Sequence, residues 1–471
     1  STCFKACTSS YPTRSPKKQY NNTLYIVIID NGLRIVQFPK GWLYIFVSFF
    51  QITTMKIALI NSEYPSPSGH DHGGIATYTY TLASALHQQG HRVHVFIREG
   101  TVPDRLAEGV KIHTYNFKPP RSSRRILNRF QDGIVQWELG HARDIRDQLN
   151  AIYAREGLDV AEFPDYGGLS ALCTQKSPFK VVINFHTPSR IVDMLNNTEP
   201  TSQRKKWYRY ESKAVSNANL YRSPSIAMRD EVCDLFKIDK SKVTVIRNPV
   251  STVPFDRIRK NHPRNSIDIL FAGRIEQRKG AGLILKTIRD ILNISPKIHM
   301  TFAGETVSDS ANNYRTAIER ALNQEQRNRI WFLGALQSQA LSVLYCRSSV
   351  FLFPSIFENA PYALFEAIAA KLPVIASASG GIKEIIDHNR TGLLFNYDNA
   401  GELTGCLSDF IDNQKHSKEM AEAAYVDLTR NHAPERIAQE SISFYQSGQS
   451  GITTTGGSLI EQKSCESRKI R

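Results

Sequence analysis

FPSIFENAPYALFEAIAAKLPVIASASGG, at residues 353–381, joins the end of one apolar strand to a loop, a helix and a second strand. The apolar run at 350–353 predicts the first strand, and the spacing of apolar residues at 362–370 predicts the helix. The second strand follows at 374–376. Strand, helix and strand in this order predict a parallel sheet with helices on both faces.

The same alternation extends over most of the chain in two blocks, which a polar and basic connector at 251–265 separates. The predicted strands of the first block are 56–60, 92–97, 160–162, 181–184, 220–222 and 243–246, with a helix at 77–88. Those of the second block are 267–271, 299–303, 330–332, 350–353 and 374–376, with a helix at 280–292. We therefore expect an α/β protein with two Rossmann-like parallel-sheet domains, at 55–250 and 266–430, that bind ligands at the carboxyl ends of their strands.

The segments outside these blocks differ in character. Met55 opens MKIALINSEYPSPSGHDHGG, which has the pattern of a first strand and its loop. We predict that the native chain starts at Met55 and that residues 1–54 are an extension outside the fold; the alternative is a genuine N-terminal region. We also predict that 431–448 form a helix that packs back on the first domain. Residues 449–471 lack apolar periodicity and predict a disordered tail.

The composition favours anionic partners. The 471 residues carry a formal net charge of +15, which suits nucleoside diphosphates, acidic lipid headgroups or nucleic acid without choosing among them. The chain has no recognised nucleic-acid motif, so we expect no nucleic-acid partner. Its seven cysteines form no CxxC pair, which predicts reduced thiols and a cytoplasmic location. The apolar run at 42–52 is about half of the ~20 residues that a membrane-spanning helix needs.

Two glutamates flank the start of the predicted helix at 362–370. Glu358 precedes the helix and Glu366 lies inside it, so both carboxylates can face one ligand. A carboxylate suits the hydroxyls of a ribose or of another sugar. A helix start attracts a diphosphate through its free amides, which here belong to Asn359, Ala360, Tyr362 and Ala363. The alternative is a surface helix with two solvent-facing glutamates.

ILFAGRIEQRKG, at residues 269–280, places Arg274 and Lys279 in a strand-to-helix loop. Arg is a planar fork and Lys a point charge, and the two can converge on one phosphate group. We expect Arg278, beside Lys279, to face solvent. The alternative is a solvated basic loop.

The first domain offers two weaker signals. HDHGGIATY, at residues 70–78, places Gly73 and Gly74 between the first strand and the first helix, where glycines let backbone approach a phosphate. The preceding residues 70–72 (HDH) resemble metal ligands, but we expect a loop without metal. His186 follows the predicted strand of VVINFHTPSR and can hydrogen-bond a sugar hydroxyl; the alternative is a structural histidine.

Taken together, these motifs resemble glycosyltransferase family 4, the retaining group 1 glycosyltransferases with the GT-B fold, over residues 55–445. The resemblance implies two Rossmann-like domains that face each other across a cleft, with the acceptor in the first and the donor in the second. It implies that Glu366 holds the ribose, that Glu358 contacts the transferred sugar, and that Arg274 and Lys279 bind the diphosphate. The family histidine maps to His186.

Other family positions map onto further motifs of this chain. The glycine loop maps to Gly73 and Gly74, and SGGIKEII places Glu384 in its usual position. WFLGALQSQ, at 331–339, is implied to border the nucleobase. Two positions depart from the pattern: Ala360 stands where an aromatic residue is common, and Lys371 where glycine is common.

The resemblance implies transfer of a hexose-type sugar from a nucleoside-diphosphate sugar to a hydroxyl acceptor, in polysaccharide or glycolipid synthesis. Anomeric configuration would be retained, and neither a cofactor nor a metal would be needed, consistent with the lack of any DxD motif. Two alternatives remain: a sugar-nucleotide epimerase, and a binding protein that kept the fold without catalysis.

Two basic segments of the first domain suggest peripheral contact with an anionic membrane, at the inner membrane face. They are RSSRRILNR at 121–129 and RKKWYRY at 204–210, in which basic residues stand beside aromatic or aliphatic ones. The alternative is two solvated helix faces.

Overall fold

The computed structural model describes residues 25–29, 32–36, 54–62, 73–99, 108–116, 133–256, 258, 265–306 and 313–447. The chain divides into two compact units, Ser1–Thr53 and Thr54–Arg471. In the first unit the described residues are the strands β1 (Tyr25–Ile29) and β2 (Gly32–Val36), which pair antiparallel. None of the helices in the described ranges combines the length and the apolar content that crossing a bilayer requires.

A seven-stranded sheet forms the centre of the N-terminal domain, in the order β5-β4-β3-β6-β7-β8-β9, and all its neighbouring strands are parallel. The strands are β3 (Lys56–Ile60), β4 (Arg92–Arg98), β5 (Lys111–Tyr115), β6 (Val160–Pro164), β7 (Lys180–Asn184), β8 (Leu220–Ser223) and β9 (Val243–Val245). The helices are α1 (Gly74–Gln88), α3 (Gly133–Glu156), α4 (Ser189–Leu195), α5 (Ser202–Ser216), α6 (Ile226–Phe236) and the 3-10 turn η1 (Lys240–Lys242). All five residues of β6 are buried, as expected for a central parallel strand covered on both faces.

The C-terminal domain repeats this design with a six-stranded parallel sheet, in the order β12-β11-β10-β13-β14-β15. The strands are β10 (Ile267–Ala272), β11 (Ile298–Ala303), β12 (Ile330–Phe332), β13 (Val350–Phe353), β14 (Val374–Ser377) and β15 (Leu393–Phe395). The helical elements are η2 (Gln277–Lys279), α8 (Ala281–Ile294), α9 (Tyr314–Ala321), α10 (Gln324–Arg327), α11 (Ser338–Arg347), α12 (Tyr362–Ala369), α13 (Ile382–Ile385), α14 (Ala400–Asp412) and α15 (Gln414–Asn431). The pair of Rossmann-like domains predicted from the sequence is confirmed.

The chain crosses between the two domains twice, and the two crossings touch. The Val250 amide donates to the His432 carbonyl at 2.8 Å, and His432 Nδ1 lies 2.8 Å from the Asn248 carbonyl oxygen. A short helix, α7 (Val253–Asp256), stands inside the segment predicted as a plain connector. Its Phe255 is buried against Tyr345, so apolar packing rather than local pattern fixes this turn.

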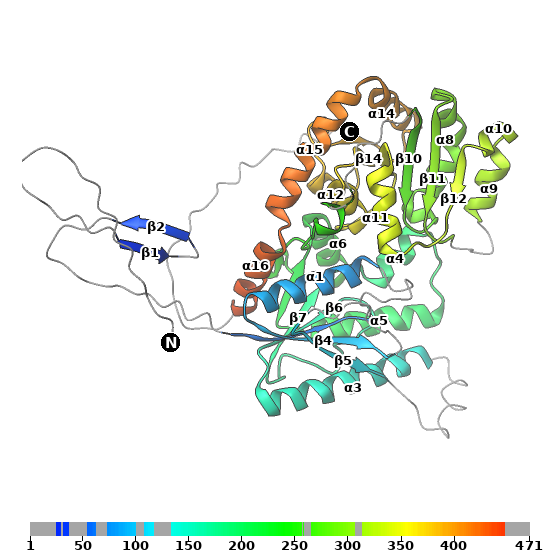
Figure 1. The fold of residues 1–471 in the computed structure, drawn as a ribbon. Helices are drawn as coiled ribbons and strands as arrows, with labels where there is room; N and C mark the ends of the chain where they lie inside the picture. The colour runs from blue at the N-terminus through cyan, green and yellow to red at the C-terminus, as the bar shows by residue number, and fades with distance from the viewer. Residues whose placement is uncertain are drawn as a thin grey trace, which may run out of the picture. The chain divides into compact units, whose positions relative to one another are not determined.

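The last helix of the described residues returns to the N-terminal domain. α16 (Pro434–Gln446) lies beside α1, the red and blue helices of Figure 1. The Tyr445 hydroxyl donates to Glu162 at 2.6 Å, and the Lys180 ammonium donates to the Tyr445 carbonyl at 2.7 Å. A buried polar network therefore binds the end of the described chain to the first sheet.

Candidate active site

Glu358, in the loop between β13 and α12, forms a buried ion pair with Lys279. Lys279 Nζ, at the end of η2, lies 2.6 Å from Glu358 Oε1. The side chains of Lys279 and Glu358 are 16% and 7% exposed, so both charges have left most of their water. Burial lowers the pKa of Lys279 and Glu358 opposes that shift. Burial raises the pKa of Glu358, but Lys279 and Arg278 together hold it below its ordinary value.

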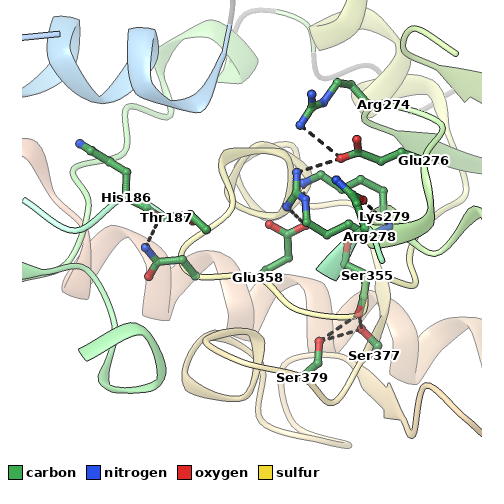
Figure 2. A network of polar contacts seen from close by, with 12 residues as sticks. His186, Thr187, Arg274, Glu276, Arg278, Lys279, Ser355, Glu358, Ser377 and Ser379 are labelled. Carbon is green, nitrogen blue, oxygen red and sulfur yellow. Dashed lines mark hydrogen bonds and ion pairs between the residues drawn. The ribbon is translucent and has the colours of Figure 1, made fainter. Parts of the chain in front are cut away.

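Further side chains of alternating charge continue this pair, as Figure 2 shows. Arg278 lies 3.7 Å from Glu358 and 3.0 Å from Glu276, and Arg274 lies 3.2 Å from Glu276. Arg274 is 53% exposed and is thus the cation at the outer end of the chain. Arg274 and Lys279 therefore belong to one network but contact different carboxylates.

The expectation that Arg278 faces solvent is wrong. Its side chain is 12% exposed, and its guanidinium bridges Glu276 and Glu358. The 3-10 turn η2 starts directly after Glu276 and changes the direction of successive side chains, which brings Arg278 inward. The Arg278 amide also donates to the Asn196 side chain of the other domain, at 3.2 Å.

Glu366 lies one turn inside α12 and is partly exposed. Burial raises its pKa to about 7, and the neighbouring Tyr345 hydroxyl opposes the shift. In the free protein this carboxyl therefore exchanges its proton near neutral pH. Tyr345 itself is buried, and its position beside Glu366 was not foreseen from the sequence.

The residues at the start of α12 connect the two domains. The Asn359 side chain donates to the carbonyls of Phe185 and His186, at 3.0 and 2.7 Å. The Ala360 carbonyl accepts from Asn248 at 3.4 Å, and the Tyr362 hydroxyl donates to the Pro249 carbonyl at 2.9 Å. The amides predicted to bind a diphosphate, up to that of Ala363, lie at the N-terminal end of α12.

The glycine loop of the first domain meets this helix. Gly73 is the extended residue that precedes α1, and a Cβ on Gly74 would lie 3.1 Å from the Tyr362 ring. Close approach between α1 and α12 therefore favours a residue without a side chain at Gly74. Residues 70–72, weighed as metal ligands, lie outside the described residues, and within the described ranges no cluster of three His, Cys, Asp or Glu side chains could hold a metal.

His186 follows the end of β7 by two residues and lies opposite the charge network in Figure 2. Its ring packs edge-on against Tyr78, with the centroids 5.1 Å apart. Burial lowers the pKa of His186 to about 4, against the attraction of Glu162, so the imidazole is neutral at pH 7. Its amide donates to Asp165 at 3.1 Å.

Asp165 is a further carboxyl at this edge that sequence reasoning missed. It is 1% exposed, and burial raises its pKa to about 8. The signal was present in AEFPDYGG, where an acidic residue directly follows the strand that ends at Pro164. Asp165 follows β6 and His186 follows the neighbouring parallel strand β7, so both lie at the same edge of the sheet.

The basic helix proposed to meet a membrane needs one correction. In α5, Trp207 is 8% exposed and its indole N–H donates to Ser189 at 3.2 Å, so it packs inward because it fills the space beneath the helix. The Tyr208 hydroxyl donates to Asp193 at 2.5 Å. Neither aromatic side chain is free to anchor in lipid. The other segment, 121–129, lies outside the described residues.

Two Rossmann-like domains that bring a basic, carboxylate-rich loop of one against the strand ends of the other define a GT-B glycosyltransferase. Residues 72–253 match the family model described as Glycosyltransferase Family 4, and residues 253–427 match the model described as Glycosyl transferases group 1. The chain belongs to the group 1 glycosyltransferases, family 4.

Relatives and solved structures agree with this placement. The chain is 25% identical to an uncharacterized glycosyltransferase of Methanocaldococcus jannaschii, over 83% of this chain and 98% of the relative. It is 24% identical to a glycogen synthase of Mycobacterium tuberculosis, over 84% and 96%. Sucrose-phosphate synthase from Thermosynechococcus elongatus has a similar fold, with a TM-score of 0.64 and 19% identity over 83% of this chain and 98% of that chain. So has Anabaena HepE in complex with UDP and glucose, with a TM-score of 0.64 and 14% identity over 83% and 100%.

Proposed function

We propose that this enzyme transfers a hexose-type sugar from a nucleoside-diphosphate sugar to a hydroxyl acceptor, with retention of anomeric configuration and without a metal ion. The observation that carries the proposal is the buried Lys279–Glu358 pair, continued by Arg278 and Glu276 to the half-exposed Arg274. Such a set of oriented cations suits a leaving group that gains negative charge.

The donor would bind along the C-terminal domain. Arg274 and Lys279 would stabilise the departing diphosphate, together with the amides at the start of α12. Glu366 would accept hydrogen bonds from the ribose, and Glu358 from the transferred sugar. One preorganised cation or donor contributes about 3 kcal/mol of transition-state stabilisation, which is on the order of a hundredfold in rate.

The charge network supports a front-face path. Glu358 is engaged by Lys279 at 2.6 Å and by Arg278 at 3.7 Å, which reduces its nucleophilicity. A leaving phosphate oxygen would then take the acceptor proton on the face from which it departs. Neutral His186 would donate or accept a hydrogen bond at a sugar hydroxyl, in keeping with its lowered pKa.

The acceptor would be a sugar, a lipid-linked sugar or a small molecule, in polysaccharide or glycolipid synthesis. Relatives named glycogen synthase and D-inositol 3-phosphate glycosyltransferase support a hydroxyl acceptor and leave its size open. The solved complexes of HepE with UDP and with UDP-glucose support a nucleotide sugar as donor.

The test begins with thermal-shift measurements in the presence of UDP, GDP and ADP and of the corresponding nucleotide sugars. Product analysis follows, with a panel of hydroxyl acceptors in the presence of EDTA. We expect stabilisation by one nucleotide series, and by NMR a glycoside with the anomeric configuration of the donor. An epimerised nucleotide sugar, or binding without any turnover, would select one of the two alternatives. An inverted product or full inhibition by EDTA would contradict the mechanism.

A further inference from the structure

Asn359 and Glu384 both belong to the C-terminal domain, yet their side chains bind the N-terminal domain. The buried side-chain amide nitrogen of Asn359 donates to the Phe185 and His186 carbonyls, as described above. The side-chain oxygen of Asn359 accepts from the Ser225 hydroxyl at 2.7 Å. All of its side-chain polar atoms are thus used across the domain boundary. A buried polar group pays its full desolvation cost if such partners are lost.

Glu384 makes the outer part of this contact. Its two carboxylate oxygens accept from the amides of Ile226 and Ala227, at 2.9 and 2.8 Å. These are the first two residues of α6, whose N-cap is Ser225. Helix N-termini carry free amides and a partial positive charge, which a carboxylate satisfies. One domain therefore caps a helix of the other.

Packing holds the same surfaces together. Phe357, from the donor loop, packs against the apolar core of the N-terminal domain. A Cβ on Gly381 would lie 1.8 Å from the Asn359 carbonyl oxygen and 3.1 Å from Ser225. The Gly381 amide donates to the Glu358 carbonyl at 2.8 Å. The loop that leads to Glu384 thus supports both the donor loop and the domain contact.

We propose that Ser225, Asn359 and Glu384 form an interdomain latch, in which Asn359 and Glu384 are positioning residues for sugar transfer. The latch fixes the loop that carries His186 against the loop that carries Glu358. Asn359 is the next residue after Glu358, and it binds the backbone carbonyl of His186. This role rests on the proposed transfer reaction, because only a reaction between ligands of two domains depends on their mutual position. A misplacement of about 1 Å can cost on the order of a hundredfold in rate.

The experiment compares Asn359→Ala and Glu384→Ala with wild type, and Glu384→Gln serves as a conservative variant that keeps one acceptor oxygen. Matched controls are Asn328→Ala and Glu319→Ala, at one exposed and one half-buried residue of the same domain, whose side chains pair with Gln324 and Arg315 of that domain. For each protein we would measure circular dichroism, the Kd of UDP, GDP and ADP, the rate of transfer, and the radius of gyration by solution X-ray scattering.

We expect Asn359→Ala to lower the transfer rate on the order of a hundredfold. The Kd of the nucleoside diphosphate should change much less, because the variant keeps the backbone amide of residue 359. Glu384→Ala should have a smaller effect, because Glu384 is exposed and water can replace its hydrogen bonds. Glu384→Gln should recover part of that loss. Both alanine variants should increase the radius of gyration, and the controls should not.

Two outcomes would overturn the latch: a wild-type radius and transfer rate in both alanine variants, or a loss of nucleotide affinity as large as the loss of rate. If one alanine variant does not fold, the other is judged by the same two criteria, and Glu384→Gln should then fall between that variant and wild type. If wild type binds no nucleoside diphosphate and transfers no sugar, the proposed function fails, and the radius of gyration alone then decides whether the latch exists.

Discussion

Lys279 Nζ lies 2.6 Å from Glu358 Oε1, so the cation proposed for the diphosphate is paired with the carboxylate proposed for the sugar. Neither group is isolated in the absence of donor, which spares the fold an unpaired buried charge. A bound diphosphate would share Lys279 with Glu358 and leave that carboxylate oriented towards the sugar.

Removing a cation of this network should slow transfer. We expect Lys279→Ala and Arg274→Ala each to lower turnover on the order of a hundredfold, because each loses one charge next to the leaving group. Steady-state rates with the preferred donor provide the measurement. Lys383→Ala, which removes an exposed lysine of the same domain, is the control and should behave as wild type. Near-normal rates in both folded variants would refute the diphosphate assignment.

The two glutamates should separate by ligand. Glu366→Ala is expected to weaken binding of the free nucleoside diphosphate, because it removes the partner of the ribose. Glu358→Ala should leave that affinity nearly intact and lower the rate of sugar transfer. Calorimetry with free nucleoside diphosphate distinguishes them, and an equal loss of affinity in both variants would contradict the division of roles.

Nucleotide affinity should rise with pH around neutrality. The pKa of Glu366 is raised to about 7, so its carboxyl is mostly protonated at pH 6 and mostly ionised at pH 8. Only the ionised form accepts from both ribose hydroxyls, which gives an increase in affinity on the order of tenfold between those values. In Glu366→Gln the diphosphate still titrates, but the part of the pH dependence that comes from Glu366 is removed. A variant with the same pH slope as wild type would show that Glu366 does not titrate on binding.

A chain that starts at Met55 should fold and be active. Met55 is buried, its carbonyl accepts from the Arg92 amide at 2.9 Å, and β3 begins at the next residue. All seven described strands of the N-terminal domain's sheet therefore follow Met55. Circular dichroism and transfer rate test this expectation, and an insoluble or inactive product would show that residues 1–54 belong to the fold.

Attraction to an anionic membrane should depend on one face of α5. Lys205, Arg209 and Lys213 are exposed and four residues apart, and each contributes about 1 kcal/mol near an anionic surface. We expect co-sedimentation with anionic vesicles at low salt, and little with neutral vesicles or at high salt. Reversing all three charges should abolish it, whereas reversal of Lys415 and Lys418 on α15 should not. Binding that ignores lipid charge would rule out this mode of attachment.

The fold class of two parallel-sheet α/β domains could be predicted from the sequence, because buried parallel strands leave continuous apolar runs. In the two domain sheets, the strands β5 and β15 were not predicted: β5 has only one buried residue, and β15 is a short strand at the sheet edge. The placement of Glu358 and Lys279 could be foreseen because both follow strand ends. The direction of the Arg278 side chain could not be predicted, because it depends on the turn η2. The contacts of Asn359 and Glu384 could not be predicted either, because their partners belong to the other domain.

One departure from the family pattern has a local explanation. Lys371, where glycine is common, has a φ of 54°, which is the left-handed region that side chains disfavour. Its ammonium pairs with Glu422 and lies over the Tyr425 ring, at 4.4 Å from the centroid. These contacts on α15 accompany a backbone that the sequence pattern alone could not reveal.

The return of α16 to the first sheet sets an order on synthesis at the ribosome. Glu162 and Arg222 are buried in the N-terminal domain, but Tyr445 and Ser441, which bind them at 2.6 and 3.1 Å, are translated more than 200 residues later. This buried polar network of the N-terminal domain can therefore form only after the whole C-terminal domain has been synthesised. Loss of α16 would therefore leave Glu162 and Arg222 without these partners and destabilise the N-terminal domain, although α16 lies more than 200 residues further along the chain.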